Sequence, residues 1–565
     1  MNMYKKILAL VLAVVMAISL CACSAGFTDS KSSAETAAPA ASGADNSGAE
    51  APASTTAKTL VAYESAEITT LQQWAVSESQ AFDAMNQAFE GLYRNDANNE
   101  AQPALATDCQ ISEDGLTYTF TIRSGAVWSN GTPVTASDFV FSWLKQMSSD
   151  ATNGYSFIMT DYIVNGAEYN AGECDAADVG VAAPDDSTFV VTLKNPCSYF
   201  LRLTTLPMFF PLNQEYVEGL GDQYATSADT MIYCGPYVIT NYDAAAGVTF
   251  TKNPTYWDAA NVAIENAEIK IIKEGATALN AFLAGDLSMV KLDASNVELY
   301  KDDPRFTSSA NFRTEYLQFN LDDPVMGNVN IRKAVSYSID VDILANAILK
   351  DGSVGAKGMI AAGMYGDGTS TFRELNGEVN YYDADAAKAA WAKGCEELGY
   401  TPEKLTLLVR DDSVTASVAT FVQDQIYSTL GVECVIDTKT TKERGTLMDE
   451  NNYQFAITAW GADYDDAMTY LDLYLVAGDT GKSTHYRGNY ASAEYNDLIN
   501  KAKVETDAAV RLDEMLKAEK LLVEQDCVVS GLYHRGAAYL IDDSVNNFVM
   551  HPFGVNYEFK YASFN

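Results

Sequence analysis

The hydrophobic positions of the chain change their spacing repeatedly from Leu60 onward, between a period of two and a period near 3.6 residues. Residues 116–122, LTYTFTI, alternate strictly, which predicts a half-buried strand with its leucine, tyrosine, phenylalanine and isoleucine pointing inward. Residues 81–93, AFDAMNQAFEGLY, place their large apolar side chains on one helical face, which predicts a helix. Strand and helix patterns that follow one another in this way are typical of an α/β protein.

The segment after the alternating strand carries two turn signals and one helix-start signal. A Ser-Gly step at 124–125 predicts the close of a hairpin, and an Asn-Gly step at 130–131 predicts a second tight turn. Thr135 is followed three residues later by Asp138, which predicts a variant of the capping box. We therefore expect a helix to begin at this point.

The C-terminal half repeats the alternation of strand and helix. KLTLLVR at 404–410 predicts a buried strand, and the helical pattern after it is expected to end at Gly431, which suits a left-handed C-cap. GVECVID at 431–437 predicts the next strand. Residues 453–466 predict an apolar strand that breaks off into acidic residues, and 508–525 predict an amphipathic helix.

The composition indicates a large globular protein with a strongly negative charge. Of 565 residues, 37 are Lys or Arg and 76 are Asp or Glu, which gives a formal charge of −39, and 48 % are hydrophobic. A chain of this length predicts about three or four domains with substantial cores. Because the negative charge repels phosphate groups and no Lys/Arg cluster offsets it, we expect no nucleic acid partner.

The N-terminus predicts export and attachment to a membrane. Two lysines precede an apolar run of 14 residues at 7–20, which is shorter than the roughly 20 residues of a membrane span, so we expect a signal peptide over 1–22. The following LCAC resembles a bacterial lipobox, in which the cysteine is acylated. Cys23 fits that role because the small Ala22 precedes it. The alternative is an ordinary secreted protein that is cleaved near Ala22.

Small and polar residues fill the segment after this cysteine. Such a composition cannot bury enough apolar surface to offset the entropy of ordering, so residues 23–58 are expected to form a flexible, lipid-anchored tether. We expect the lipid anchor to be the only contact with the membrane, and the folded part to lie at the outer face of the cytoplasmic membrane.

The sequence shows no arrangement of residues that is typical of catalysis. The three histidines do not share a metalloprotease spacing, and the nine cysteines include no CxxC pair, so we expect no metal and no cofactor. We assign no disulfide. Adjacent acidic residues are expected by chance among 76 acids, with a solvated turn as their default role. These observations favour a binding protein over an enzyme.

Several long segments of the chain have the form of motifs of one known protein family. The most specific is DGLTYTFTIRSGAVWSNGTPVTASDFVFSW at 114–143. Others are CGPYVITNYDAAAGVTFTKNPTYWD at 234–258, the segment from YLQFN to IRKAVSYSID at 316–340, AWGADYDDAMTYLD at 459–472 and EYNDLINKA at 494–502. With these segments the chain resembles the extracellular solute-binding proteins, family five, of dipeptide, oligopeptide and nickel ABC importers. The resemblance is closest to the oligopeptide-binding proteins.

The resemblance implies an α/β, two-lobed fold of the periplasmic-binding-protein type II-like kind, with an extra subdomain inserted in the first lobe. The lobes would close around the ligand, and the chain would cross between them near 312–317 and 530–533. The implied parts are lobe I at 59–91, the inserted subdomain at 92–215, lobe I again at 216–315, lobe II at 316–530 and a return to lobe I at 531–565.

The resemblance also implies site residues. Oligopeptide-binding relatives hold the peptide ammonium with an aspartate in a W-x-A-D-Y stretch, which matches Trp460, Asp463 and Tyr464 here. Trp460 and Tyr464 would cover apolar side chains of the ligand, and Tyr155 aligns with a tyrosine that contacts the ligand. The alternative for Asp463 is a turn residue that caps the next segment.

Dipeptide-binding relatives hold the peptide carboxylate with an arginine near Arg410. The alternative is that Arg410 pairs with Asp411 or Asp412. Some long-peptide binders carry an arginine just before the tryptophan motif, whereas residues 456–458 are Ala-Ile-Thr here. The sequence therefore leaves open how a ligand carboxylate is held.

The function implied is that of a lipoprotein of an ABC importer that captures peptides and delivers them to permease subunits driven by ATPase partners. We expect a monomer. The alternatives are the same family binding a nickel chelate, an oligosaccharide or a signalling peptide, or a surface adhesin or chaperone without a role in transport. An extracellular hydrolase on the same scaffold is disfavoured because no nucleophile and base pattern is present.

Overall fold

The computed structural model describes residues 58–76, 78–152, 155–476, 483 and 488–565. The predicted signal peptide, the acylated Cys23 and the tether up to residue 57 lie outside the described residues. Within the described ranges, no helix is both long enough and apolar enough to cross a membrane.

A four-stranded sheet forms the first layer of the folded part. Its strand order is β1 (Thr59–Glu64), β10 (Asn266–Ile271), β9 (Gly247–Lys252) and β8 (Tyr237–Asp243). β1 pairs parallel with β10, and the other pairs are antiparallel. Since β1 and its partner are about two hundred residues apart in sequence, the chain between them is free to build a separate sheet.

That second sheet is antiparallel, in the order β4 (Ala106–Ile111), β5 (Thr117–Ile122), β7 (Thr188–Thr192) and β6 (Val181–Asp185). The alternation predicted for 116–122 is confirmed, because every second side chain of β5 is buried. Helix α3 (Ala136–Met147) packs on this sheet, and its Trp143 meets Phe189 edge-to-face with ring centroids 4.9 Å apart. The predicted Thr135–Asp138 capping box begins α3 and is confirmed.

Two local predictions for this region are wrong. The Ser-Gly step at 124–125 does not close a hairpin, because both edges of β5 are already paired, with β4 and β7. The helix predicted over 81–93 is α2 (Ser79–Ala88), which ends early because Phe89 is extended. Gly91 then passes so close to the backbone of Thr204 that an added Cβ would lie 2.8 Å from its carbonyl oxygen. The Asn-Gly turn is confirmed by the bridge between Val127 and Pro133 on either side of it.

The largest sheet has the order β11 (Met289–Leu292), β17 (Val529–Ile541), β12 (Phe306–Phe319), β16 (Phe455–Gly461), β14 (Lys404–Arg410) and β15 (Glu433–Lys439), and β13 (Val354–Gly355) adds to β17. The strands predicted at 404–410, 431–437 and within 453–466 are confirmed as β14, β15 and β16. Helix α14 (Ser413–Leu430) ends at Gly431, which has the expected left-handed conformation.

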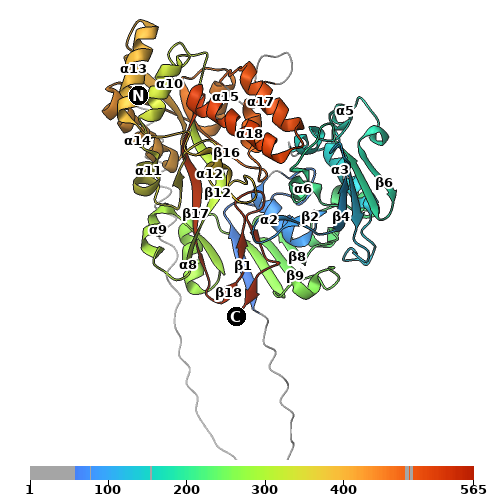
Figure 1. Cartoon of the computed structure of the whole chain (residues 1–565). Helices are drawn as coiled ribbons and strands as arrows, with labels where there is room; N and C mark the ends of the chain where they lie inside the picture. The colour runs from blue at the N-terminus through green and yellow to red at the C-terminus, as the bar shows by residue number, and fades with distance from the viewer. Residues whose placement is uncertain (1–57, 77, 153–154, 477–482, 484–487) are drawn as a thin grey trace, which may run out of the picture. The chain divides into compact units, whose positions relative to one another are not determined.

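Two long strands run through the centre of this sheet. β12 and β17 pair antiparallel over most of their length, and the register shifts twice between them (Figure 1). The pairing joins Leu317 to Ser530 and Tyr316 to Gly531, so the two segments expected to cross between lobes lie side by side.

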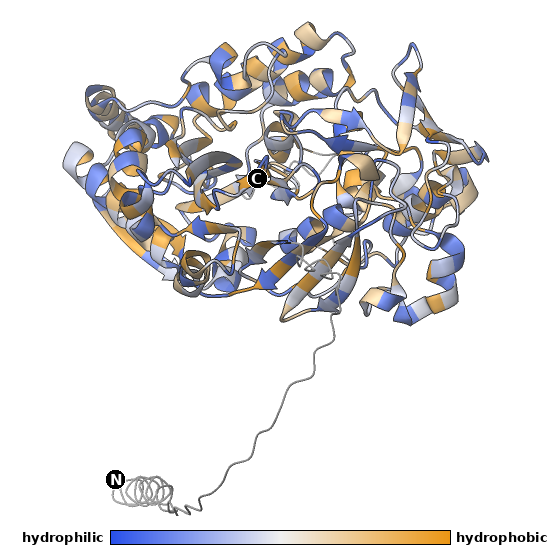
Figure 2. Ribbon diagram, turned by 90° about the horizontal axis from the view of Figure 1, so that it is seen from below, coloured by the Kyte–Doolittle hydropathy of each residue, from blue (hydrophilic) through white to orange (hydrophobic). Residues whose placement is uncertain are grey.

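Helices and short strands complete the described part of the fold. In Figure 2 hydrophilic and hydrophobic stretches alternate along both the strands and the outer helices. The predicted helix at 508–525 is confirmed as α18 continued by a π-helical stretch, Lys520–Gln525. The remaining helices are α4 (Phe157–Thr160), α5 (Gly166–Asn170), α6 (Phe200–Leu203), α7 (Gln214–Leu220), α8 (Gly275–Ala284), α9 (Ala294–Tyr300), α10 (Val329–Tyr337), α11 (Val341–Ile343), a π-helix (Leu344–Leu349), α12 (Phe372–Asn376), α13 (Ala384–Leu398), α15 (Thr441–Asp449), α16 (Met468–Leu471), α17 (Ala493–Val504) and α18 (Ala508–Glu519). The short strands are β2 (Tyr93–Asn95), β3 (Ala101–Pro103), β18 (Val545–Asn546), β19 (Val549–Met550), β20 (Tyr557–Glu558) and β21 (Ser563–Phe564).

Candidate ligand-binding site

Two adjoining cavities lie where the first and the largest sheets meet. The larger, called the cleft here, has a volume of about 650 Å³. Its walls are the carboxyl ends of β1, β11 and β16, the start of α2, the middle of β12 and β17, and the loop 550–557. Strand ends of α/β sheets are the usual place for ligands, because the chain there turns away and leaves a crevice.

The smaller cavity, called the side pocket, has a volume of about 250 Å³. It shares Ser79, Ala462 and Gly554 with the cleft, so the two spaces adjoin. Its remaining wall is mostly apolar and includes a single carboxylate. The residues of that wall are Phe82, Tyr155, Leu206, Met208 and Asp463.

Asp463 supplies the carboxylate of the side pocket. It follows the end of β16 by two residues, and its backbone N–H donates to Thr469 Oγ1 at 3.3 Å. Within the described residues, no hydrogen bond or ion pair reaches its side-chain oxygens. Burial raises the pKa of Asp463 to about 6. A half-buried carboxylate without a protein cation is stabilised by any cation that enters the pocket.

Tyr155 is the other predicted site residue that lines the side pocket. Its ring meets Phe82 edge-to-face, with centroids 5.8 Å apart, and stacks on Phe157. Burial, and then the nearby charge of Asp463, raise the pKa of Tyr155. The structure therefore brings Tyr155 and Asp463 together, although 308 residues separate them in sequence.

Trp460 and Tyr464 lie beside the site without lining either cavity. The Trp460 indole donates to Thr469 Oγ1 at 3.4 Å, the same oxygen that accepts from the Asp463 backbone. Tyr464 is buried, and its ring stacks on Tyr199 with centroids 4.8 Å apart and planes inclined by 5°. Tyr464 thus joins the end of β16 to the inserted sheet region, and Trp460 positions the loop that carries Asp463.

Arg410 is turned toward protein carboxylates and lines neither cavity. Its guanidinium donates to Asp412 at 2.9 Å and to Glu315 at 3.4 Å. The buried Glu315 also accepts from Arg313 at 3.2 Å. Pairing with Asp412, one of the two alternatives weighed for Arg410, is the arrangement that the structure contains.

Basic residues of the cleft were missed in the sequence. Lys291 on β11, Arg313 on β12 and Arg535 on β17 all line it, and Lys273 lies at its edge. Burial, and then the charge of Arg535, lower the pKa of Lys291. These residues come from strands that are far apart in sequence, so no local motif marks them. Lys291, Arg313 and Arg535 each lie on a different strand, so their common position in the cleft could be recognised only after the strand order was known.

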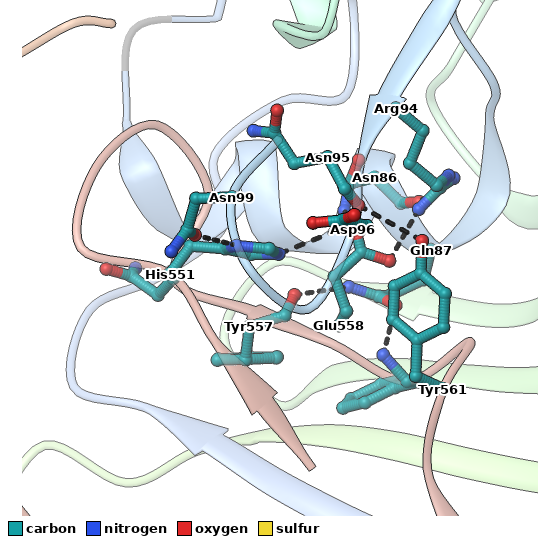
Figure 3. Close-up of polar contacts among 12 residues, drawn as sticks. Asn86, Gln87, Arg94, Asn95, Asp96, Asn99, His551, Tyr557, Glu558 and Tyr561 are labelled. Carbon is teal, nitrogen blue, oxygen red and sulfur yellow. Dashed lines mark hydrogen bonds and ion pairs between the residues drawn. The ribbon is translucent and has the colours of Figure 1, made fainter. Parts of the chain in front are cut away.

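A buried network holds the C-terminal wall of the cleft against α2 (Figure 3). The network is called the clamp here, and it centres on Arg94 and Glu558, whose side chains are joined at 2.7 Å. Arg94 also donates to Glu90 at 2.6 Å, and Glu558 accepts from Asn86 at 2.9 Å. His551 approaches Glu558 to 3.7 Å.

The same wall is held by two further polar contacts. The side-chain amide of Gln87 donates to the Tyr557 carbonyl at 3.0 Å, and the Gln87 side-chain oxygen accepts from the Phe559 N–H at 2.9 Å (Figure 3). The Tyr557 hydroxyl donates to Glu64 at 2.9 Å, at the edge of the cleft. The clamp therefore fixes the loop 550–557 relative to α2, whose first turn also lines both cavities.

A metal centre has no support in the described part of the chain. No group of three or more His, Cys, Asp or Glu side chains there is placed to hold a metal ion. The side pocket offers a carboxylate beside apolar surface, and the cleft offers several cations, an arrangement that suits a charged organic ligand.

The family of the protein follows from comparison with known proteins. The model of the bacterial extracellular solute-binding proteins, family 5, matches residues 100–482. The chain therefore belongs to this family, and its mixed α/β fold is that of the family's periplasmic binding proteins.

Individual relatives agree over most of the chain. The dipeptide-binding protein DppE of Bacillus subtilis is 29 % identical over 84 % of this chain and 86 % of its own, and the oligopeptide-binding protein OppA of the same species is 28 % identical over 86 % and 89 %. Among solved structures, Listeria monocytogenes OppA bound to peptide is 31 % identical, with a TM-score of 0.73 over 90 % of this chain and 100 % of that one.

Proposed function

We propose that this protein captures peptides outside the cytoplasm and delivers them to the permease of an ABC importer, without catalysing a reaction. The observation that carries the proposal is Asp463, a half-buried carboxylate of the side pocket that has no cation partner among the residues that the structure describes. A peptide ammonium would supply the missing charge through short, charge-assisted hydrogen bonds. The relatives named as dipeptide- and oligopeptide-binding proteins support the same ligand class.

The other site residues take supporting roles in this proposal. Tyr155 would contact the first residue of the peptide beside Asp463, and apolar side chains would occupy the wall around Phe82. Trp460 and Tyr464 would hold the Asp463 loop in place. The ligand carboxylate would be met by cations of the cleft, and Arg410 would act only through Glu315 and Arg313.

Closure of the cleft would combine two lobes as the family resemblance implies. In this proposal lobe II comprises 316–530, and lobe I comprises 59–91, 216–315 and 531–565 with 92–215 inserted. The pairing of β12 with β17 supports the proposal, because two adjacent strands can twist together with little repacking. Cys23 would carry the lipid that keeps the protein, as a monomer, at the outer face of the cytoplasmic membrane.

The experiment is a calorimetric titration of the mature protein with a mixture of unmodified di- to pentapeptides, and with the same peptides acetylated at the N-terminus. Unmodified peptides are expected to bind, and either acetylation or Asp463→Asn is expected to weaken binding at least tenfold, about 1.4 kcal/mol. Asp411→Asn is the matched control, because Asp411 is an exposed acid outside both cavities. Equal binding by wild type and Asp463→Asn would remove the ammonium anchor.

A further inference from the structure

The cleft is lined by more cations than carboxylates, in a chain where acids outnumber bases two to one. Its basic residues are Lys273, Lys291, Arg313 and Arg535, and its acidic residues are Glu64 and Asp293. A local excess of positive charge in a protein of formal charge −39 is not what random placement gives. Such a focused field raises the local concentration of anionic ligands.

Three of these cations share one face of the largest sheet. β17 lies between β11 and β12, and the register pairs Lys291 with Tyr539 and Thr314 with His534. Tyr539 and Arg535 are four residues apart on β17, so their side chains lie on the same face. Arg313, next to Thr314, faces the same cleft. The cations therefore form a row across three neighbouring strands.

Protein carboxylates neutralise this row only in part. Arg313 pairs with Glu315 at 3.2 Å, but Glu315 also pairs with Arg410. Lys273 is paired with Glu67 at 2.6 Å. Among the residues that the structure describes, Arg535 has no hydrogen bond or ion pair, and it lies close enough to Lys291 to repel its charge.

The acidic residues that line the cleft form no ion pair with the remaining cations, Lys291 and Arg535, within the described residues. Glu64 accepts from the Tyr557 hydroxyl, and burial raises the pKa of its carboxyl group. Asp293 begins α9 and lies against Gly275, at the start of α8. Glu64 and Asp293, with Asp351, lie near enough to Lys291 to attract its charge. Neither Glu64 nor Asp293 forms an ion pair with Lys291 or Arg535 within the described residues. The like charges of Lys291 and Arg535 would be relieved by an anion that enters between them.

We propose that the row of Lys291, Arg313 and Arg535 is a subsite for an acidic side chain, so that the protein prefers peptides that contain aspartate or glutamate. The inference rests on the proposed peptide capture and names the class of peptide. The guanidinium of Arg535 can bind a carboxylate through two parallel hydrogen bonds, and Lys291 adds a second positive charge. The ammonium anchor at Asp463 lies beyond the end of β16, so one extended peptide can reach both.

The test compares tetra-alanine peptides in which one of positions 2 to 4 is replaced by Glu or by Gln, each as a free acid and as a C-terminal amide. At one position, Glu is expected to bind about tenfold more tightly than Gln at low salt, in both the acid and the amide. The amide arm separates a side-chain subsite from recognition of the terminal carboxylate alone. Raising the salt concentration is expected to reduce the difference.

The variant Lys291→Gln/Arg535→Gln is expected to abolish the preference for Glu over Gln in the peptide amides, which have no terminal carboxylate for these cations to bind. Lys270→Gln is the matched control, because Lys270 lies on β10 outside the cleft and pairs with Glu268. Melting temperatures of both variants show whether they fold like the wild type.

Three outcomes would overturn the proposal. Gln and Glu peptides that bind equally at every position would overturn the acidic subsite while leaving peptide capture intact. A Glu preference that disappears in the amides would assign the row to the terminal carboxylate. No binding of any peptide would overturn both this subsite and the proposed function.

Discussion

The clamp and the side pocket both contain buried or half-buried carboxylates, but the pKa of the carboxylate is lowered in the clamp and raised in the side pocket. In the clamp, burial raises the pKa of Glu558, but Arg94, His551 and Asn86 together outweigh burial and the pKa falls to about 2. In the side pocket, burial acts without a cation and raises the pKa of Asp463 to about 6. The Glu558 carboxylate is paired with a protein cation when the chain folds, whereas the Asp463 carboxylate is free to pair with a cation of the ligand.

The same contrast occurs within four residues of one loop. Asp466 is buried and receives two hydrogen bonds from Arg511, at 2.7 and 2.9 Å. Asp463 receives none from the described side chains. Two aspartates of one acidic run therefore have different roles, one in packing α18 against the loop and one facing the cavity.

The largest effect is expected from breaking the clamp. Glu558→Gln leaves Arg94 with one buried carboxylate fewer, and is expected to lower the free energy of unfolding by about 2–4 kcal/mol. Urea denaturation at neutral pH measures it. Because the folded-state pKa of Glu558 is depressed, the wild-type advantage should be full above about pH 5 and disappear toward pH 2.

Lys501→Gln is the control for the clamp, since Lys501 forms an exposed pair with Asp497 and is expected to cost less than about 0.5 kcal/mol. A loss below about 1 kcal/mol for Glu558→Gln would show that the clamp is not a main support of the C-terminal wall.

The next effect is the pH dependence of peptide binding. Ionised Asp463 is needed to hold an ammonium group, so affinity is expected to be constant above about pH 6 and to fall up to tenfold for each pH unit below it. Titrations from pH 4.5 to 8 with one peptide measure the profile. Asp463→Asn should flatten it, and a variant profile that still falls below pH 6 would assign the titration to another group.

A smaller effect of opposite sign is expected on stability without ligand. The folded-state pKa of Asp463 is raised, so its contribution favours folding below the unfolded pKa and is lost as the pH rises through about 6. At pH 7 the charged side chain opposes folding, and Asp463→Asn is expected to raise the melting temperature by about 1–2 °C. At pH 4 the gain should disappear. A lower melting temperature at pH 7 would indicate that Asp463 is a capping residue of its turn.

The smallest effect is expected at Arg410. Its charge is already shared between Asp412 and Glu315, so Arg410→Gln should change peptide affinity less than about threefold. The same titration measures it. A loss of tenfold or more would make Arg410 a direct holder of the ligand carboxylate.

Much of the fold could be predicted from the sequence, because local patterns decide it. The alternation at 116–122 and the cap at Gly431 each depend on side chains close in sequence, and both predictions are confirmed. The Ser-Gly step forms a turn but closes no hairpin, because the partners of β5 are β4 and β7. The early end of α2 comes from the extended backbone of Phe89, which the helical pattern of 81–93 does not reveal.

The candidate site could be predicted only where a motif of the family carried it. Asp463 and Tyr155 were found in this way, and both line the side pocket. The row of Lys291, Arg313 and Arg535 was missed, because its members lie up to 244 residues apart and meet only through the strand order of the sheet. The burial of Tyr464 against Tyr199 was missed for the same reason.

The loop 550–557 has a consequence for how the protein matures. β1 and α2 are made first, but the wall that they share with this loop, and the Glu558 that holds it, come about 470 residues later. The cleft can therefore gain its last wall only after the final residues of the chain have been synthesised, so any shortened chain that ends before the loop 550–557 has a cleft that is open on that side.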